Sequence, residues 1–156
     1  MGERNVTETV ELPEARATDA LGARLAARLR PGDAVLLEGD LGAGKTHLAR
    51  ACIRAMQAAA GQPPEDVPSP TFTLVQTYGA GAMEIWHLDL YRLSAPDEAW
   101  ELGLEEALER AVCLIEWPAR LGWTPPGALT VRLEADPTGD GRVAHLSGPA
   151  RLEAAA

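Results

Sequence analysis

Lysine is almost missing from this 156-residue chain: Lys45 is the only one, and the other 13 of its 14 basic side chains are arginines. The 14 basic side chains are outnumbered by 23 acidic ones, so the formal net charge is −9. A protein that grips nucleic acid by itself normally carries a basic face, and the sequence shows none. Any role near RNA would therefore run through a partner that supplies the positive charge.

Cysteines, aromatic residues and long apolar runs are also few. Cys52 and Cys113 both lie inside apolar segments with no spacing typical of a metal site, so we expect buried free thiols. Aromatic residues make up 4% of the chain, which leaves Leu, Ala and Val to fill most of the core. No apolar stretch approaches the ~18 residues of a membrane helix, and the polar, acidic N-terminus is unlike a signal peptide. We expect a cytoplasmic protein.

The length predicts a single domain over residues 1–156, in which segments 1–11 and 150–156 are the candidates for disorder. Between them, helical and strand patterns alternate. Two pairs of strand-like runs are joined by glycine-rich links and predict antiparallel hairpins. We therefore predict an α/β fold of three layers with a mixed parallel and antiparallel sheet. The expected helices cover 13–30, 45–60 and 94–111, and the expected strands cover 34–39, 71–78, 83–91, 111–116, 128–135 and 142–148.

Residues 39–46, GDLGAGKT, match the pattern G-x-x-x-x-G-K-[ST] at every position. Glycines such as Gly39 let the backbone curl so that its N–H groups point at phosphate oxygens. The following helix aims its N-terminus at the same anion, Lys45 can reach the β- and γ-phosphates, and Thr46 offers a hydroxyl to Mg²⁺. A chance glycine turn is the alternative, but a buried strand before the segment and a helix after it are the context that the motif requires. A P-loop NTPase-like fold follows.

The P-loop raises two further questions: which base the nucleotide carries, and which residues hold the metal. Guanine-specific P-loop proteins read the base with a second lysine in an [NT]KxD segment, and this chain has none left, so adenine is favoured. A P-loop also needs carboxylates to place the metal and the attacking water. Glu116 ends one apolar strand and Asp89 ends the second strand of the first hairpin. Either could instead be a surface or salt-bridged acid; Glu116 is favoured as the metal partner.

Three further features have two readings each. His87 and Asp89 share a face of one strand, and without a third ligand nearby they indicate a polar site lining rather than a transition-metal pair. The loop Ser69–Thr73 is either a switch-like segment that closes on phosphate or a turn that caps its own backbone. Trp117 either stacks near a nucleotide or packs, and packing is the usual case.

The segments GDLGAGKT, SPTFTLVQTY, HLDLYRL and CLIEWP, in this order, resemble the TsaE family, over a region from about Leu12 to about Ser147. The resemblance implies a bacterial P-loop ATPase required for making threonylcarbamoyladenosine beside the anticodon of tRNAs that read codons beginning with A. It implies work with TsaD, which carries the transferase site, and with TsaB, so that tRNA is met only through the complex. ATP and Mg²⁺ are the implied cofactors.

The resemblance also implies roles for individual residues. Thr46 and Glu116 would bind Mg²⁺, Asp89 would lie at the phosphates with a catalytic role beside Lys45 and Glu116, and Thr71 would belong to the switch-like loop. A turn containing Gly141 would approach the adenine. An acidic residue near the first helix often nears the nucleotide in the family; here Glu14 and Ala15 compete for that position, and after EWP the chain reads ARLG without the acid or amide often found next. The phosphates would be cradled by Leu41, Gly42, Ala43, Gly44, Lys45 and Thr46.

Two other functions are weighed against this one. A stand-alone small-molecule kinase on a P-loop scaffold would need an arginine-bearing lid, and the candidates Arg92, Arg110 and Arg120 are scattered along the sequence. A nucleotide-binding module without turnover would bind ADP tightly and release no phosphate.

Overall fold

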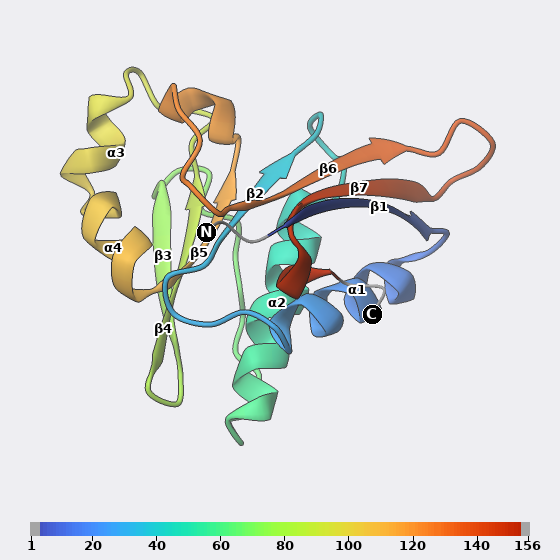
Figure 1. Ribbon diagram of the computed structural model, residues 1–156, viewed down its shortest axis with the longest axis horizontal. Coiled ribbons are helices and arrows are strands. Elements are labelled where there is room, and N and C mark those ends of the chain that lie inside the picture. Colours follow the sequence, from blue (N-terminus) through green and yellow to red (C-terminus); the bar gives the residue numbers. More distant parts are fainter. Residues whose placement is uncertain (1–3, 154–156) are drawn as a thin grey trace.

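Seven strands form one mixed sheet in the computed structural model, which describes residues 4–153 (Figure 1). The strand order is β1-β7-β6-β2-β5-β4-β3. Strands β6, β2, β5 and β4 run parallel, and β1, β7 and β3 are antiparallel to their neighbours. The strands are β1 Asn5–Leu12, β2 Ala34–Glu38, β3 Val75–Ala80, β4 Met83–Asp89, β5 Val112–Glu116, β6 Leu129–Ala135 and β7 Arg142–Pro149. The α-helices are α1 Ala15–Ala26, α2 Lys45–Ala59, α3 Asp97–Glu101 and α4 Leu104–Arg110, and the 3₁₀ turns are η1 Pro118–Leu121 and η2 Ala150–Leu152.

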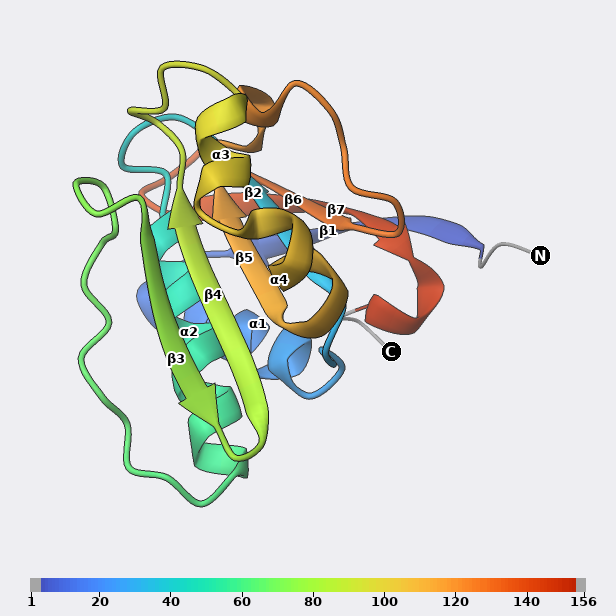
Figure 2. The ribbon, with the colours of Figure 1, turned by 90° about the vertical axis from the view of Figure 1, so that its left-hand side faces the viewer.

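Helices cover the central strands on both faces, with α3 and α4 in front of β4 and β5 and with α1 and α2 behind (Figure 2). Parallel strands covered on both faces must be apolar on both, which explains the uninterrupted runs AVLL and VCLI. In β2, Val35 and Leu37 pack with α1 and α2, while Ala34 and Leu36 pack with α3 and α4. The two cores therefore meet at β2, the strand that leads into residues 39–46.

The predicted secondary structure is largely confirmed, with differences at boundaries. Both hairpins form, as β3–β4 and β6–β7. The first one is tighter than the glycine link suggested, because β3 continues through Ala80 and only Gly81 and Ala82 turn. The helix expected over 94–111 is two short helices, since Gly103 between them adopts φ 92°, a left-handed conformation that stops a helix.

Part of the segment 1–11, a candidate for disorder in the sequence, forms a strand in the structure. Residues 5–12 form β1, which pairs with β7 from Asn5 opposite Pro149 to Leu12 opposite Arg142. Val6 and Val10 are half-buried and Leu12 is buried, so the alternation in NVTETVEL was a strand pattern of period two. At the other end, in the second candidate segment, η2 buries Leu152. Residues 1–3 and 154–156 lie outside the described residues.

Cys52 and Cys113 are free and buried, as predicted. They lie in opposite cores, and burial raises the pKa of each thiol to about 12. Among residues 4–153, none of the helices combines the length and the hydropathy needed to cross a bilayer.

Candidate nucleotide site

The loop between β2 and α2, residues 39–46 and called the P-loop below, curls because three glycines adopt positive φ angles. These angles are 145° at Gly39, 80° at Gly42 and 102° at Gly44. At Gly39 the space is also closed, since a Cβ atom would lie 2.5 Å from the carbonyl oxygen of Leu133. No side chain caps the start of α2. The N–H groups of the helix start therefore have no side-chain acceptor, which is the usual form of a phosphate-binding helix N-terminus.

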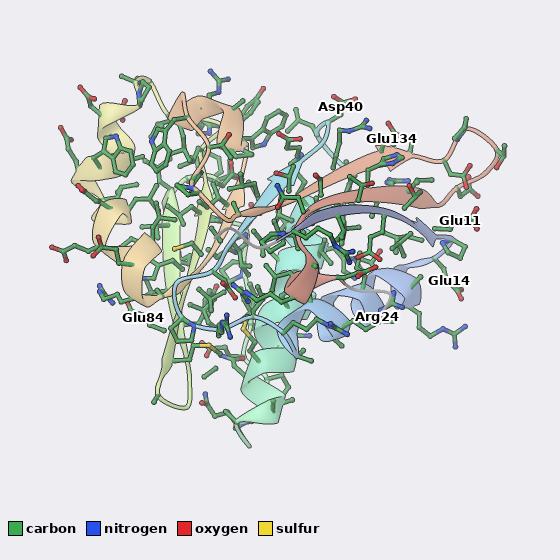
Figure 3. All side chains as sticks on the ribbon, in the orientation of Figure 1. Glu11, Glu14, Arg24, Asp40, Glu84 and Glu134 are labelled. Carbon is green, nitrogen blue, oxygen red and sulfur yellow. The ribbon has the colours of Figure 1, made fainter. Side chains whose placement is uncertain are left out.

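Lys45 is folded back over the P-loop. It is 5% exposed, and its Nζ donates to the carbonyl oxygens of Gly39 at 2.6 Å and Asp40 at 2.8 Å. The ammonium also lies 4.2 Å from the ring centre of Trp117, at a distance typical of a cation–π contact. Burial lowers the pKa of Lys45, and the carboxylates of Glu116, Asp89 and Asp40 oppose this shift. Figure 3 shows Asp40 at the outer end of the loop.

Glu116, at the end of β5, is the centre of a buried hydrogen-bonded group. The hydroxyl of Thr46 lies 2.9 Å from both carboxylate oxygens, and the Nε2 atom of His87 lies 2.6 Å from Oε2. Glu116 is 2% exposed and His87 is fully buried. Because a carboxylate only accepts hydrogen bonds, Nε2 of His87 carries its proton and the Thr46 hydroxyl donates. The lone pairs of the Thr46 oxygen are left for another partner.

Asp89, at the end of β4, has its own separate set of donors. The Thr71 hydroxyl donates to Oδ2 at 3.0 Å and the Tyr91 amide donates to Oδ1 at 3.0 Å. Parallel pairing of β4 with β5 places Asp89 directly opposite Glu116, so the two carboxylates are neighbours on the sheet edge. The loop Ser69–Thr73 thus reaches the site through Thr71, whose hydroxyl also bonds that of Ser69 at 2.7 Å.

Most of the predicted residues meet at one cavity of about 270 Å³. Gly39 and Ala43 do not line it, because Gly39 lines a separate cavity beside Leu133 and Ala43 is buried in the core. Gly141 does not line it either. The predicted residues that do line it are Leu41, Gly42, Gly44, Lys45, Thr46, Thr71, Asp89 and Glu116.

A second cavity, of about 290 Å³, lies on the other side of the start of α2. It shares Gly42, Gly44 and His47 with the first, so the two cavities are continuous around the P-loop. Gly141 lines this second cavity, where a Cβ atom would lie 2.7 Å from a backbone oxygen of β1. Glu14 and Ala15, the two alternatives for the family's acidic position near the first helix, both line it as well. Figure 3 shows Glu14 at the start of α1.

Several residues of the site were not found from the sequence. His47 lines both cavities and lies 2.7 Å from Asp19. Arg142 lines the second cavity and donates to the carbonyl oxygen of Gly42 at 3.1 Å. Their signals were weak but present, since His47 follows the motif directly and Arg142 follows Gly141. Trp117 is part of the first cavity rather than of the core alone.

Backbone strain also points to this region. Among residues 4–153, the only non-glycine residues with positive φ are Leu74 at 67° and Trp117 at 59°. The Leu74 carbonyl accepts from the Asp89 amide at 2.9 Å, and Trp117 follows Glu116 directly. Such conformations cost about 1–3 kcal/mol each and concentrate at functional sites.

The donor set at Thr46 and Glu116 suits a hard cation. Hydroxyl and carboxylate oxygens are what Mg²⁺ prefers, and Mg²⁺ at nucleotide sites takes only one or two protein ligands beside phosphate and water. Within residues 4–153, no group of three or more His, Cys, Asp or Glu side chains could hold a metal by itself. The Nε2 atom of His87 is already hydrogen-bonded to Glu116.

The arginines considered for a lid are placed unequally. Arg110 pairs with Glu84 near the amino end of β4, whereas Asp89 of the site ends the same strand. Arg92 lies 4.4 Å from the ring centre of Phe72, next to Thr71, and Arg120 lies 5.9 Å from that of Tyr91. Phe72 and Tyr91 do not themselves line the first cavity, but Phe72 follows Thr71 in sequence and the ring of Tyr91 contacts that of Trp117, and both Thr71 and Trp117 do line it.

Comparison with known proteins decides the family. The family model described as "Threonylcarbamoyl adenosine biosynthesis protein TsaE" matches residues 12–143. The chain belongs to the TsaE family. The resemblance found from the P-loop, SPTFTLVQTY, HLDLYRL and CLIEWP is thereby confirmed.

Individual TsaE relatives agree with this assignment. A protein of Rickettsia conorii named "tRNA threonylcarbamoyladenosine biosynthesis protein TsaE" is 48% identical over 120 residues, covering 76% of this chain and 66% of the relative. TsaE proteins of Synechocystis and Bacillus subtilis are 39% and 40% identical, with 73% and 64% of this chain covered and 72% and 60% of the relatives. The chain thus spans about two thirds or less of the length of most of these relatives.

A solved structure confirms the predicted fold class. The crystal structure of Bacillus subtilis YdiB superposes with a TM-score of 0.67 at 25% identity, covering 96% of this chain and 88% of that one. Its P-loop fold and the mixed sheet described above are the α/β architecture expected from the sequence.

Proposed function

We propose that this protein is an ATP-binding, weakly ATP-hydrolysing accessory subunit in the formation of threonylcarbamoyladenosine in tRNA. In this proposal it serves tRNAs that read codons beginning with adenine, acts with a TsaD/TsaB transferase complex in the cytoplasm, and meets tRNA only through that complex. The names of its TsaE relatives supply the pathway, and the net charge of −9 is poorly suited to holding tRNA without a basic partner.

One observation carries the nucleotide part of the proposal. The P-loop, Lys45 and two carboxylates, each with its own threonine hydroxyl, converge on a single cavity. The P-loop amides supply donors for phosphate oxygens, and Lys45 would exchange its two carbonyl contacts for the β- and γ-phosphates. The first cavity, of about 270 Å³, would hold the phosphates.

Each carboxylate has a distinct task in this scheme. Thr46 and Glu116 would hold Mg²⁺, which when bound neutralises charge on the phosphates. The Thr46 hydroxyl can continue to donate its hydrogen bond to Glu116 while a lone pair of its oxygen faces the metal. Asp89, fixed by Thr71 and the Tyr91 amide, would orient the attacking water. Because Thr71 lies in the Ser69–Thr73 loop, that loop would sense whether the site is filled.

The adenosine part of the ligand would lie in the second cavity. That cavity is reached around Gly42 and Gly44 and is bordered by Glu14, Gly141 and Arg142. The absence of a second lysine in the whole sequence supports adenine over guanine, as argued from the motif. Gly141 would border the base.

The proposal is tested by titrating the purified chain with ATP and Mg²⁺ in a calorimeter, then measuring phosphate release with and without TsaD and TsaB. We expect ATP to bind more tightly than GTP, turnover to be slow in the chain alone, and turnover to rise when both partners are added. Lys45→Ala is the matched control that should bind neither nucleotide measurably.

Two outcomes would replace the proposal. Fast phosphate release without partners that rises with a small alcohol or nucleoside would identify a kinase, in which Arg92 and Arg120, which contact Phe72 and Tyr91, would be the first lid residues to examine. Tight ADP binding with no phosphate release under any condition would identify a binding module without turnover.

A further inference from the structure

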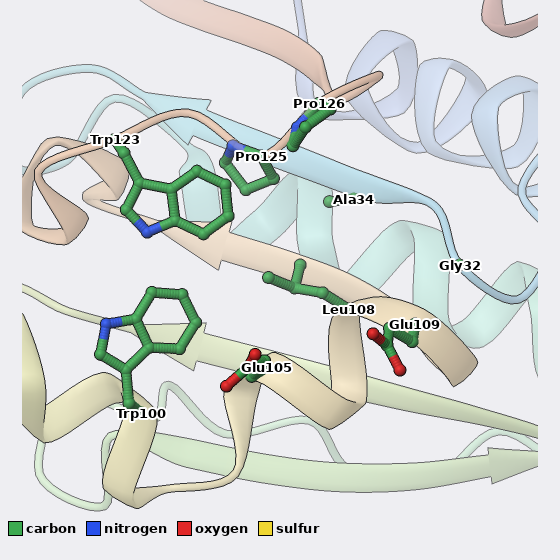
Figure 4. A pocket seen from close by; sticks show the side chains of 9 residues that line it. All are labelled: Gly32, Ala34, Trp100, Glu105, Leu108, Glu109, Trp123, Pro125 and Pro126. Carbon is green, nitrogen blue, oxygen red and sulfur yellow. The ribbon is translucent and has the colours of Figure 1, made fainter.

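A larger cavity lies apart from the nucleotide site, on the face of the sheet that α3 and α4 cover (Figure 4). Its volume is about 660 Å³, within the range of roughly 300–1,000 Å³ that ligand pockets occupy. It includes Gly32 and Ala34 at the amino end of β2, whereas the P-loop follows the carboxyl end. None of the residues assigned to the nucleotide lines it, so this cavity is a separate site.

Two tryptophans form one wall of the cavity. Trp100 of α3 and Trp123, which follows η1, stack with ring centres 5.5 Å apart and planes 18° from parallel. Leu108 and Pro125 continue the apolar lining (Figure 4). Trp123 remains 42% exposed. Tryptophan partly exposed beside a pocket is typical of positions that dominate binding energy at protein interfaces.

Two carboxylates of α4 also line the cavity. Glu105 and Glu109 lie one turn apart on α4, on either side of Leu108 (Figure 4). Within residues 4–153 neither carboxylate makes a side-chain hydrogen bond or an ion pair. The segment 97–110 holds six acidic side chains and one arginine, Arg110, which is already paired with Glu84. The cavity therefore presents flat aromatic surface beside uncompensated negative charge.

We propose that this cavity docks an arginine side chain of a partner protein. A guanidinium group is planar, stacks on an aromatic face and donates in a fork to carboxylates, whereas the compact, strongly hydrated ammonium of lysine gains less from a flat stack. The carboxylates stand on an exposed helix, so a side chain can enter while its backbone stays outside. Among residues 4–153, the lining holds no cationic side chain that could pair with the α-carboxylate of a free amino acid, whereas an arginine within a protein presents only its guanidinium group.

The test follows the indole N–H signals of the whole protein by ¹H–¹⁵N NMR. The four tryptophans give four signals, which single Trp→Phe variants assign. The probe is a capped Gly-Arg-Gly tripeptide, and its citrulline counterpart is the neutral analogue of the same shape. We expect the signals of Trp100 and Trp123 to shift in a saturable way, with a Kd of about millimolar order, while those of Trp86 and Trp117 stay in place. The citrulline peptide should bind at least about threefold more weakly.

Charge variants make the test specific. The double variant Glu105→Gln/Glu109→Gln should weaken binding of the arginine peptide by about 3- to 10-fold. Glu106→Gln removes the same charge from the same helix but does not line the cavity, and it should leave the affinity unchanged. The proposal is overturned if the two indole signals do not shift, if all four shift together, or if citrulline binds equally well. It is also overturned if Glu106→Gln weakens binding as much as the double variant, or if free arginine binds as tightly as the capped peptide.

Discussion

Replacing Glu116 by glutamine should remove most of the effect of Mg²⁺ on ATP binding. In the native site the Thr46 hydroxyl donates to the carboxylate, and His87 Nε2 donates to Oε2 at 2.6 Å. A glutamine would turn its oxygen toward the His87 proton and its NH₂ group toward Thr46. The Thr46 hydroxyl would then accept a hydrogen bond, and its proton would point toward the metal position. This single substitution thus removes the negative charge of Glu116 and turns the Thr46 hydroxyl so that its proton, rather than a lone pair, faces the metal position.

The expected changes in metal affinity and in stability distinguish a local effect of Glu116→Gln from loss of the fold. Changes of this kind beside a metal typically lower metal affinity by about 10- to 100-fold. Stability should change by no more than about 1 kcal/mol, because the variant is isosteric and both the Thr46 hydroxyl and Nε2 of His87 keep a hydrogen-bond partner. Without Mg²⁺, the affinity for ATP should be equal or higher, since one carboxylate that repels the phosphates is gone.

The assay is the affinity for a fluorescent ATP analogue, measured in excess Mg²⁺ and again in a chelator. The native protein should bind more tightly with Mg²⁺, and Glu116→Gln should lose most of that difference. Asp89→Asn is the matched variant, since it removes the neighbouring charge on β4 while leaving Thr46 and Glu116 in contact. If Glu116→Gln kept the full Mg²⁺ effect and Asp89→Asn lost it, the metal role would belong to Asp89 and the reasoning from Thr46 would be wrong.

Three further predictions follow from single residues. Lys45→Ala should weaken ATP binding by about 100-fold or more with a cooperative urea transition, and loss of that transition would mean that the lysine is structural. Gly39→Ala should lower the free energy of unfolding by at least about 2 kcal/mol, because residue 39 has φ 145° and the new Cβ atom would lie 2.5 Å from a β6 carbonyl oxygen. Gly42→Ala should lower it by only about 1–2 kcal/mol, because residue 42 has φ 80° but its Cβ atom would lie in open space. The thiols of Cys52 and Cys113 should resist alkylation until urea unfolds the chain, because burial raises their pKa from 9.0 to about 12. Unfolded thiols ionise first, so stability should fall as pH rises from about 9 toward 12, and rapid native alkylation would contradict the burial.

The parts of the structure that sequence predicted best are those fixed by local rules. The P-loop is set by glycine conformations and by the strand and helix around it, so its position could be read from eight consecutive residues. The two hairpins carried glycine turns between β-rich runs. Glu116 was predicted at a strand end because the first polar side chain after an apolar run marks where a strand buried on both faces stops.

Other features depend on pairings between distant segments. The alternation in β1 is weak and polar, and only its pairing with β7 makes it a strand. The bond from His87 to Glu116 requires that β4 lie beside β5 in a particular register, which no local pattern contains. Arg142 reaches Gly42 across 100 positions of sequence. The second cavity is built from such distant contacts, which is why its lining was predicted only through the family resemblance.

The register between β4 and β5 also explains why the site has two carboxylates with unlike surroundings. Asp89 and Glu116 lie opposite each other on neighbouring strands. Two carboxylates so close disfavour each other's charged form, and sharing the same hydrogen-bond donors would leave each charge less well stabilised. They do not share them: Glu116 takes its hydroxyl donor from α2, and Asp89 takes its own from the Ser69–Thr73 loop. A rigid helix therefore holds one carboxylate and a long proline-rich loop holds the other. In the proposed function, the metal position at Thr46 and Glu116 would therefore be fixed before ATP binds, and the arrangement around Asp89 would be the part that a bound phosphate or a partner protein can change.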